Sequence, residues 1–154
     1  MIYLLRHAKA GRRGACGSRD TLRPLDSKGR QQAIALCELL DDVPLDVILS
    51  SPFVRCMETV IPIAARRMLP IEPHPALRES TPLPLVLDLV REHANRSVLL
   101  CTHGDVIGDV LGHLESAGWL DPGMLDLPIA KGSTWVLRHR SDGTLAATEY
   151  RPAP

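Results

Sequence analysis

Aromatic side chains are scarce in this chain of 154 residues, which contains two Trp, two Tyr and one Phe. So few rings disfavour a nucleic-acid surface built on base stacking. Neither sign of charge is in excess, because 18 basic residues balance 18 acidic ones. Broad electrostatic binding to nucleic acid or to an anionic membrane is therefore not expected, and we predict neither partner.

Cysteine pairs and long apolar runs are also missing. The four cysteines form no CxxC pair, and a chain of this length can fold without disulfides; they are Cys16, Cys37, Cys56 and Cys101. No apolar run reaches about 18 residues, and no signal-peptide pattern opens the sequence. We expect reduced thiols, a cytoplasmic location and no membrane span. With no repeat or linker, residues 1–154 are predicted to form a single domain.

Several kinds of catalytic or binding site are excluded or disfavoured by the sequence. No GxxxxGK[ST] or GxGxxG sequence occurs, so a Walker or Rossmann nucleotide site has no support. A cysteine-dependent phosphatase would need arginine six positions after its cysteine, but those positions hold Leu22, Val43, Pro62 and Ile107. Zinc binding by the two histidines discussed below is disfavoured, because their arginine neighbours would repel a cation. We predict no metal and no cofactor.

Short apolar runs alternate with helical patterns along the chain. The runs at 2–5, 47–49 and 98–101 predict buried strands, and 134–139 with 145–150 predict a hairpin. This alternation predicts an α/β fold with three layers, α/β/α, and a mostly parallel sheet with helices on both faces.

Four helices are predicted between these strands. One begins with Ser27 as its N-cap, and another begins at about Pro52 and is kinked or divided by Pro62. The others cover about 83–93 and 104–117. The proline-rich stretch from 70 to 84 is predicted to be mostly extended or loop.

Polar residues follow two of the predicted strands directly. Arg6 and His7 come after the first, and His103 comes after the run at 98–101. Ligands of such sheets gather at the carboxyl ends of the strands, so these residues are expected to share a pocket. Residues 6–30 add eight basic side chains against two acidic ones, which favours an anionic ligand, although a solvated basic loop would look the same.

These residue types suit phosphoryl transfer. A neutral imidazole can attack phosphorus, and we assign that role to His7. The planar guanidinium groups of Arg6 and Arg55 match pairs of phosphate oxygens, and a protonated His103 can donate one more charged hydrogen bond. The leaving group needs a proton, for which we choose Glu79. Asp105 and Asp20 remain alternatives for this donor.

Four segments resemble motifs of the histidine phosphatase superfamily, which is also called phosphoglycerate mutase-like, and they occur in its order. Leu-Leu-Arg-His-Ala at 4–8 is similar to its Arg-His-Gly signature, with Ala8 in place of glycine. Pro-Leu-Asp-Ser-Lys-Gly-Arg-Gln-Gln-Ala at 24–33 is similar to its L-T-x-x-G-x-x-Q-A segment. Ser-Ser-Pro-Phe-Val-Arg-Cys-Met-Glu-Thr at 50–59 resembles S-S-P-x-x-R-x-x-x-T, and Thr-His-Gly at 102–104 resembles its second x-H-G motif.

The resemblance implies a phosphoglycerate mutase-like fold without a large helical insertion. It implies that His7 is phosphorylated and that Arg6, Arg55 and His103 form the phosphate pocket. Lys9 and Gly104 join these three as substrate-binding candidates. Glu79 is similar to the family's proton donor, although Ser-Thr-Pro-Leu-Pro at 80–84 replaces the usual continuation of that motif.

The implied function is a phosphohydrolase with a covalent phosphohistidine intermediate. Its substrate would be a phosphoprotein carrying phosphohistidine, as in the short bacterial members, or a small phosphorylated metabolite or nucleotide. The opening at 6–11 is also similar to histidine phosphatase domains fused to Nudix hydrolases, which suggests nucleotides. The alternative from another class is a catalytically silent module that binds phospho-ligands on the same fold.

Overall fold

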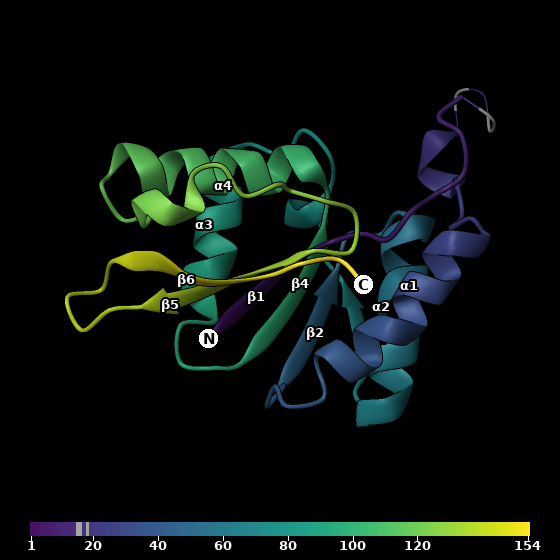
Figure 1. Ribbon diagram of the computed structural model, residues 1–154, viewed down its shortest axis with the longest axis horizontal. Helices are drawn as coiled ribbons and strands as arrows, with labels where there is room; N and C mark the ends of the chain where they lie inside the picture. The colour runs from purple at the N-terminus through teal and green to yellow at the C-terminus, as the bar shows by residue number, and fades with distance from the viewer. Residues whose placement is uncertain (15–16, 18) are drawn as a thin grey trace.

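The computed structural model describes residues 1–14, 17 and 19–154, so Cys16 lies outside the described residues. Its strands form one sheet in the order β3-β2-β4-β1-β5-β6 (Figure 1). The strands are β1 (Ile2–Arg6), β2 (Val47–Ser50), β3 (Ile71–Pro73), β4 (Val98–Thr102), β5 (Thr134–His139) and β6 (Leu145–Arg151). The α-helices are α1 (Ser27–Leu39), α2 (Val54–Arg67), α3 (Leu83–Glu92) and α4 (Gly104–Ser116).

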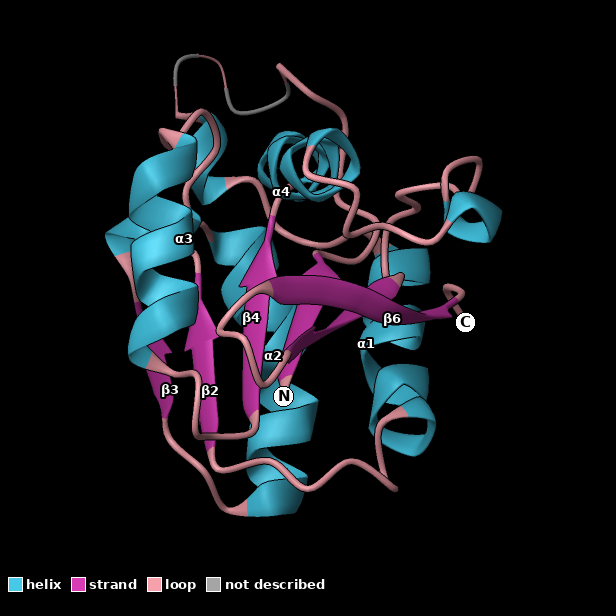
Figure 2. Ribbon diagram, turned by 90° about the vertical axis from the view of Figure 1, so that its left-hand side faces the viewer, coloured by secondary structure: helices cyan, strands magenta, loops and turns pink. Residues whose placement is uncertain are grey.

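The sheet is mostly parallel. Strands β3, β2, β4 and β1 pair in parallel, whereas β5 and β6 form an antiparallel hairpin that extends the sheet beside β1 (Figure 2). Helices α3 and α4 lie on one side of this sheet, and α1 and α2 lie on the other (Figure 1). The predicted three-layer α/β/α fold is therefore confirmed.

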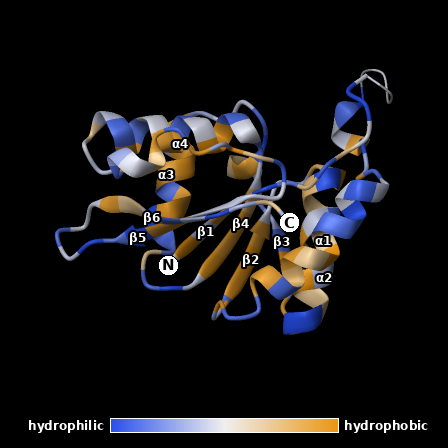
Figure 3. Ribbon diagram, in the orientation of Figure 1, coloured by the Kyte–Doolittle hydropathy of each residue, from blue (hydrophilic) through white to orange (hydrophobic). Residues whose placement is uncertain are grey.

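Alternation along the buried strands explains the two helical layers. In β1, Ile2 and Leu4 pack into the core under α3 and α4, whereas Tyr3 and Leu5 pack into the core under α1 and α2. Successive side chains of a strand point to opposite faces, so an uninterrupted apolar run needs cover on both faces. Figure 3 shows this apolar centre as hydrophobic strands between amphipathic helices.

The start of α1 differs from the expectation. Asp26, and not Ser27, is the N-cap residue, and its side chain accepts a hydrogen bond of 2.8 Å from the backbone N–H of Gly29. Ser27 is the first helical residue. A carboxylate at this position also interacts favourably with the positive end of the helix dipole.

The expectation that Pro62 divides a helix is not met, whereas the expectation for residues 70–84 is confirmed. Helix α2 begins at Val54 and runs through Pro62 without division, because Val60 and Ile63 on either side of it are buried against the sheet. Their packing outweighs the roughly 3 kcal/mol that an internal proline costs. The stretch from 70 to 84 is mostly extended or turn, as expected, but it also supplies the short edge strand β3.

Among the described helices, none has the length and apolar character needed to cross a membrane.

Candidate active site

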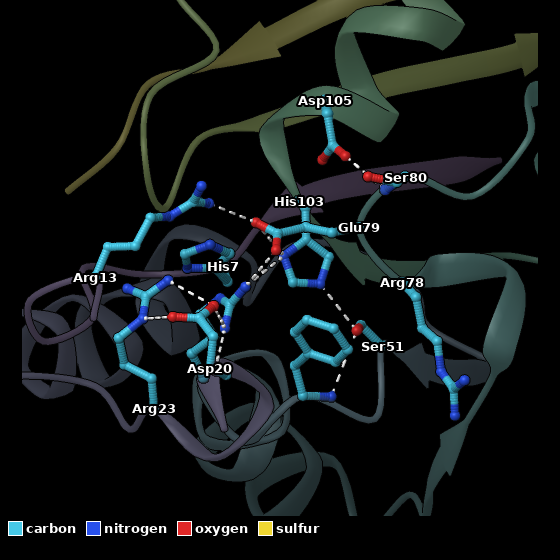
Figure 4. Close-up of polar contacts among 12 residues, drawn as sticks. His7, Arg13, Asp20, Arg23, Ser51, Arg78, Glu79, Ser80, His103 and Asp105 are labelled. Atoms are coloured by element: carbon cyan, nitrogen blue, oxygen red, sulfur yellow. Dashed lines mark hydrogen bonds and ion pairs between the residues drawn. The ribbon is translucent and has the colours of Figure 1, made fainter. Parts of the chain in front are cut away.

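The carboxyl ends of β1 and β4 bring the two predicted histidines together. These strands are parallel neighbours with Arg6 opposite Thr102, and the backbone N–H of His7 donates to the carbonyl of Thr102 over 3.0 Å. The rings of His7 and His103 are 5.3 Å apart between centroids and meet edge to face. Figure 4 shows both rings in one cluster. The prediction that these two strand ends are neighbours is confirmed.

His7 is held in one tautomer by its neighbour in the chain. Its Nδ1 lies 2.7 Å from the carbonyl oxygen of Ala8, and a carbonyl oxygen only accepts, so Nδ1 carries the hydrogen. Burial is the main cause that lowers the pKa of His7 to about 3, and the nearby cations act in the same direction. The ring is therefore neutral at pH 7, with the lone pair on Nε2.

Arg55 lies at the bottom of the cluster and is fully buried. One terminal nitrogen donates to the backbone carbonyl of Asp20 over 3.0 Å and lies 3.2 Å from its carboxylate. The other lies 3.1 Å from the carboxylate of Glu79. A guanidinium ion without solvent needs such partners, since an unpaired buried charge is very costly. The guanidinium also lies over the ring of Phe53, 4.8 Å from its centroid.

His103 stands between Arg55 and Ser51. Its Nδ1 is 3.4 Å from a terminal nitrogen of Arg55, which can only donate, so this Nδ1 accepts and Nε2–H donates to the Ser51 hydroxyl over 2.9 Å. Burial first, and then the charge of Arg55, lowers the pKa of His103 to about 3. The free protein thus holds both pocket histidines in the neutral form.

Arg6 reaches the cluster from the end of β1 over a glycine. Its guanidinium donates to the carbonyl of Ile129, and a Cβ built on Gly104 would lie only 2.9 Å from its central carbon. A side chain at position 104 would thus push this guanidinium away. Lys9 lines the same cavity but is half exposed, with its ammonium 3.6 Å from Asp26.

The three candidate proton donors lie in different surroundings. Besides Arg55, Glu79 contacts Arg13 at 3.0 Å and lies 3.7 Å from Nδ1 of His103 (Figure 4). Asp20 is bound by Arg23 at 2.8 Å, and this hydrogen bond is the main cause that lowers its pKa. Asp105 lines the cavity and accepts a 2.7 Å hydrogen bond from the backbone of Ser80.

Three motif residues without an assigned role shape the backbone that follows His7. The Thr59 hydroxyl accepts from the N–H of Ala8 over 3.0 Å, and the side-chain oxygen of Gln32 accepts from the N–H of Lys9 over 3.0 Å. A Cβ on Gly29 would lie 1.8 Å from the Lys9 carbonyl oxygen, so only glycine fits there.

Sequence reasoning missed three residues of the site. Ser51 fixes the ring of His103, and Arg23, almost fully buried, positions Asp20. Lys131 lines the cavity from the loop before β5. The excess of basic residues at 6–30 was a weak signal for Arg23, whereas no local pattern marks Lys131.

Many of these groups line an open cavity of about 860 Å³. Arg55 and His103 are buried beside one of its lining residues, Glu79. Its lining contains six basic side chains against three acidic ones; the basic ones are Arg6, Lys9, Arg12, Arg13, Arg23 and Lys131. The acidic ones are Asp26, Glu79 and Asp105. Such a cavity attracts anions, and the neutral imidazole of His7 lines it beside these basic side chains.

The sequence and the fold of this chain are similar to those of known proteins. Residues 2–81 match the model of the histidine phosphatase superfamily (branch 1). A curated relative, the 8-oxo-(d)GTP phosphatase of Mycolicibacterium smegmatis, is 31% identical over 160 residues. The match covers 99% of this chain but 48% of the relative, so the chain spans about half the length of the curated relative that it matches.

Solved structures share the fold over nearly their whole length. A chain described as phosphohistidine phosphatase SixA of Agrobacterium tumefaciens aligns with a TM-score of 0.80 and 25% identity, covering 98% of this chain and 96% of that one. The protein histidine phosphatase SixA complexed with tungstate aligns with a TM-score of 0.78 and 21% identity, covering 97% and 94%.

Proposed function

Because this chain belongs to the histidine phosphatase superfamily (branch 1), we propose that it hydrolyses phosphorylated substrates through a phosphohistidine formed at His7. The observation that carries the proposal is the fixed tautomer of this ring. The 2.7 Å hydrogen bond from Nδ1–H to the Ala8 carbonyl leaves the lone pair on Nε2, and His7 lines the cavity together with six basic side chains. A lowered pKa keeps that lone pair free at pH 7.

The cations around His7 match the charge of a transferred phosphoryl group. Arg6 and Arg55 supply planar N–H groups for the equatorial oxygens, and His103 supplies another once it is protonated. A bound dianion favours that protonation, since it opposes the burial and the Arg55 charge that lower the pKa of His103 in the free protein. Loss of one such donor typically costs about 100- to 1000-fold in rate.

In the first step, Nε2 of His7 forms a bond to phosphorus while the bond from phosphorus to the leaving atom breaks. The electron pair of the broken bond goes to the leaving group, which takes up a proton. In the second step, water attacks the phosphohistidine, so that inorganic phosphate is released and the Nε2 lone pair is restored.

Glu79 is the donor that we assign for the leaving group. Its carboxylate contacts Arg55 and lies 3.7 Å from His103, so it borders the place that the phosphoryl group would occupy. A dianion bound there would compete with the Glu79 carboxylate for Arg55. Asp20 is less suited to donate the proton, because its hydrogen bond with Arg23 lowers its pKa and keeps its carboxylate ionised.

We assign the substrate to one of two classes, a phosphohistidine-bearing protein or a small phosphorylated metabolite or nucleotide. The cavity is open and broad enough for either. Among similar proteins, SixA is named a phosphohistidine phosphatase, and the Mycolicibacterium smegmatis relative is named an 8-oxo-(d)GTP phosphatase. We further propose a cytoplasmic location, since Cys37, Cys56 and Cys101 are unpaired thiols. We also propose that residues 1–154 form a single domain, because all six strands belong to one sheet.

The test is hydrolysis of para-nitrophenyl phosphate together with acid-quench trapping of ³²P-labelled protein. We expect turnover and labelled His7 in the wild type, and neither in His7→Ala. Lys28→Ala, an exposed change on α1, is the matched control and should behave as wild type. Tight binding of inorganic phosphate without turnover would show a silent binding module instead, and labelling of a residue other than His7 would refute the mechanism.

A further inference from the structure

Two lysines on the rim of the cavity are linked through one side chain. Gln32 accepts from the N–H of Lys9 over 3.0 Å with its oxygen, and its nitrogen donates to the carbonyl of Lys131 over 3.1 Å. Gln32 is itself almost fully buried. The loops at 9 and 131 are therefore fixed against each other, although 122 positions separate the two lysines in sequence.

The lysine-bearing loop at 129–132 is also fixed to the phosphate pocket. The N–H of Gly132 donates to the backbone carbonyl of Arg6 over 3.0 Å, and the Arg6 guanidinium donates to the carbonyl of Ile129. Lys131 thus lies directly beside the residue that would bind the transferred phosphoryl group, and both line the same cavity.

The positive charge on this rim is only weakly neutralised. Lys131 has no acidic partner within 4.0 Å among the residues that the structure describes, and Lys9 has only Asp26 at 3.6 Å. Burial, followed by the charges of Arg6 and Arg23, lowers the pKa of Lys131. Its ammonium therefore stands in an environment where a further anion would relieve repulsion between cations.

We propose that Lys9 and Lys131 form a second anion site, which binds the non-scissile phosphate of a diphosphate substrate. This inference rests on the proposed function of the neighbouring site. A diphosphate fits because one bridging oxygen joins its two phosphorus atoms, so its second phosphate must lie next to the first. An acidic side chain of a phosphorylated protein lies several bonds from the scissile phosphorus and has no such requirement.

A diphosphate would be hydrolysed in the same two steps. Nε2 of His7 forms a bond to the terminal phosphorus, and the bond from that phosphorus to the bridging oxygen breaks. The bridging oxygen keeps the electron pair and leaves as part of the second phosphate. Water then releases the terminal group as inorganic phosphate. Lys9 and Lys131 would stabilise the negative charge that develops on the leaving phosphate, which makes this leaving group less dependent on a proton from Glu79.

Competitive inhibition of para-nitrophenyl phosphate hydrolysis tests the site, with inorganic phosphate and the non-hydrolysable methylenediphosphonate as probes. The readout is the ratio of their inhibition constants, which removes effects common to both anions. In the wild type we expect methylenediphosphonate to bind more tightly than phosphate. In Lys9→Met/Lys131→Met this preference should fall by about tenfold, the size expected when charged hydrogen bonds at a partly exposed site are lost.

Lys28→Met is the matched control, because it removes the third of the chain's three lysines from an exposed position on α1. It should keep the wild-type ratio. Equal weakening of both anions in the double variant, or an unchanged ratio, would overturn the second site, as would a preference for an acidic phosphopeptide that is lost in this variant. If the wild type hydrolyses nothing, calorimetric titration with the same two anions still tests the site, so its failure can be told from failure of the proposed function.

Discussion

The two pocket histidines make the stability of the folded protein depend on pH in a defined window. Each has a pKa lowered from 6.5 to about 3 in the folded state, with burial as the main cause. Between about pH 3 and pH 6.5 the unfolded chain therefore binds protons at these two histidines, whereas the folded protein keeps them neutral. For a depressed folded pKa, the stabilisation is complete above about pH 6.5 and is lost as pH falls toward 3.

The size of the effect follows from the shifts. Near pH 5 each unfolded histidine holds almost one proton more than its folded counterpart, so each changes the free energy of unfolding by about 1.4 kcal/mol per pH unit. His7 and His103 together contribute a slope of about 2.7 kcal/mol per unit, and the loss between pH 7.5 and pH 5 is about 4 kcal/mol. This is a large part of the roughly 5–15 kcal/mol typical of a folded domain.

Urea unfolding at half-unit steps from pH 7.5 to pH 5 measures this slope. The range lies above the titration of the carboxylates, such as Asp20, whose lowered pKa values make their stabilisation fade only below about pH 4 to 5. His7→Gln and His103→Gln should each remove about 1.4 kcal/mol per unit, and the double variant should lose both contributions. A double variant with the wild-type slope would refute the assignment of neutral, buried imidazoles.

Three further substitutions, and one control substitution, test which contacts hold the site. Gly29→Ala should destabilise the protein by at least about 3 kcal/mol in urea unfolding, because its Cβ would meet the Lys9 carbonyl at 1.8 Å, whereas Gly112→Ala in α4 has open space and should gain up to about 1 kcal/mol. Thr59→Val keeps the shape but leaves a buried N–H unpaired, so we expect about 1–3 kcal/mol of destabilisation in the same assay, together with slower para-nitrophenyl phosphate turnover. Asp26→Ala should destabilise the protein by the loss of the α1 cap, and an unchanged stability in the same assay would contradict its role as N-cap.

Most of the fold could be predicted from the sequence, because the patterns that indicate its strands and helices are local. The apolar runs of β1 and β4 mark strands buried on both faces, and polar residues directly after them must lie at the carboxyl edge of the sheet. Proximity of His7 and His103 follows from that rule once the two strands are neighbours. Whether Pro62 divides α2 could not be read in the same way, because the decision depends on how well its neighbours pack against the sheet.

The contacts of the residues around the cavity could not be predicted from the sequence, for a related reason. Glu79 could be named from the motif, but its contacts with Arg55 and Arg13 join three segments that are distant in sequence. Lys131 gave no signal at all, since its place depends on the hydrogen bond from Gln32 across the molecule. Long-range side-chain contacts of this kind leave no periodic trace in a single sequence.

The matching motifs therefore divide into two physical roles. Some of their residues form the catalytic cluster, as His7, Arg55 and His103 do, and their chemistry can be argued from residue type alone. Others, such as Gly29 and Thr59, are not among the residues that line the cavity and instead hold the backbone that follows His7. That backbone supplies the carbonyl that fixes the His7 tautomer, so the nucleophile depends on residues whose own side chains have no reactive group. A chain that kept the first set and lost the second would carry the signature without a correctly oriented imidazole.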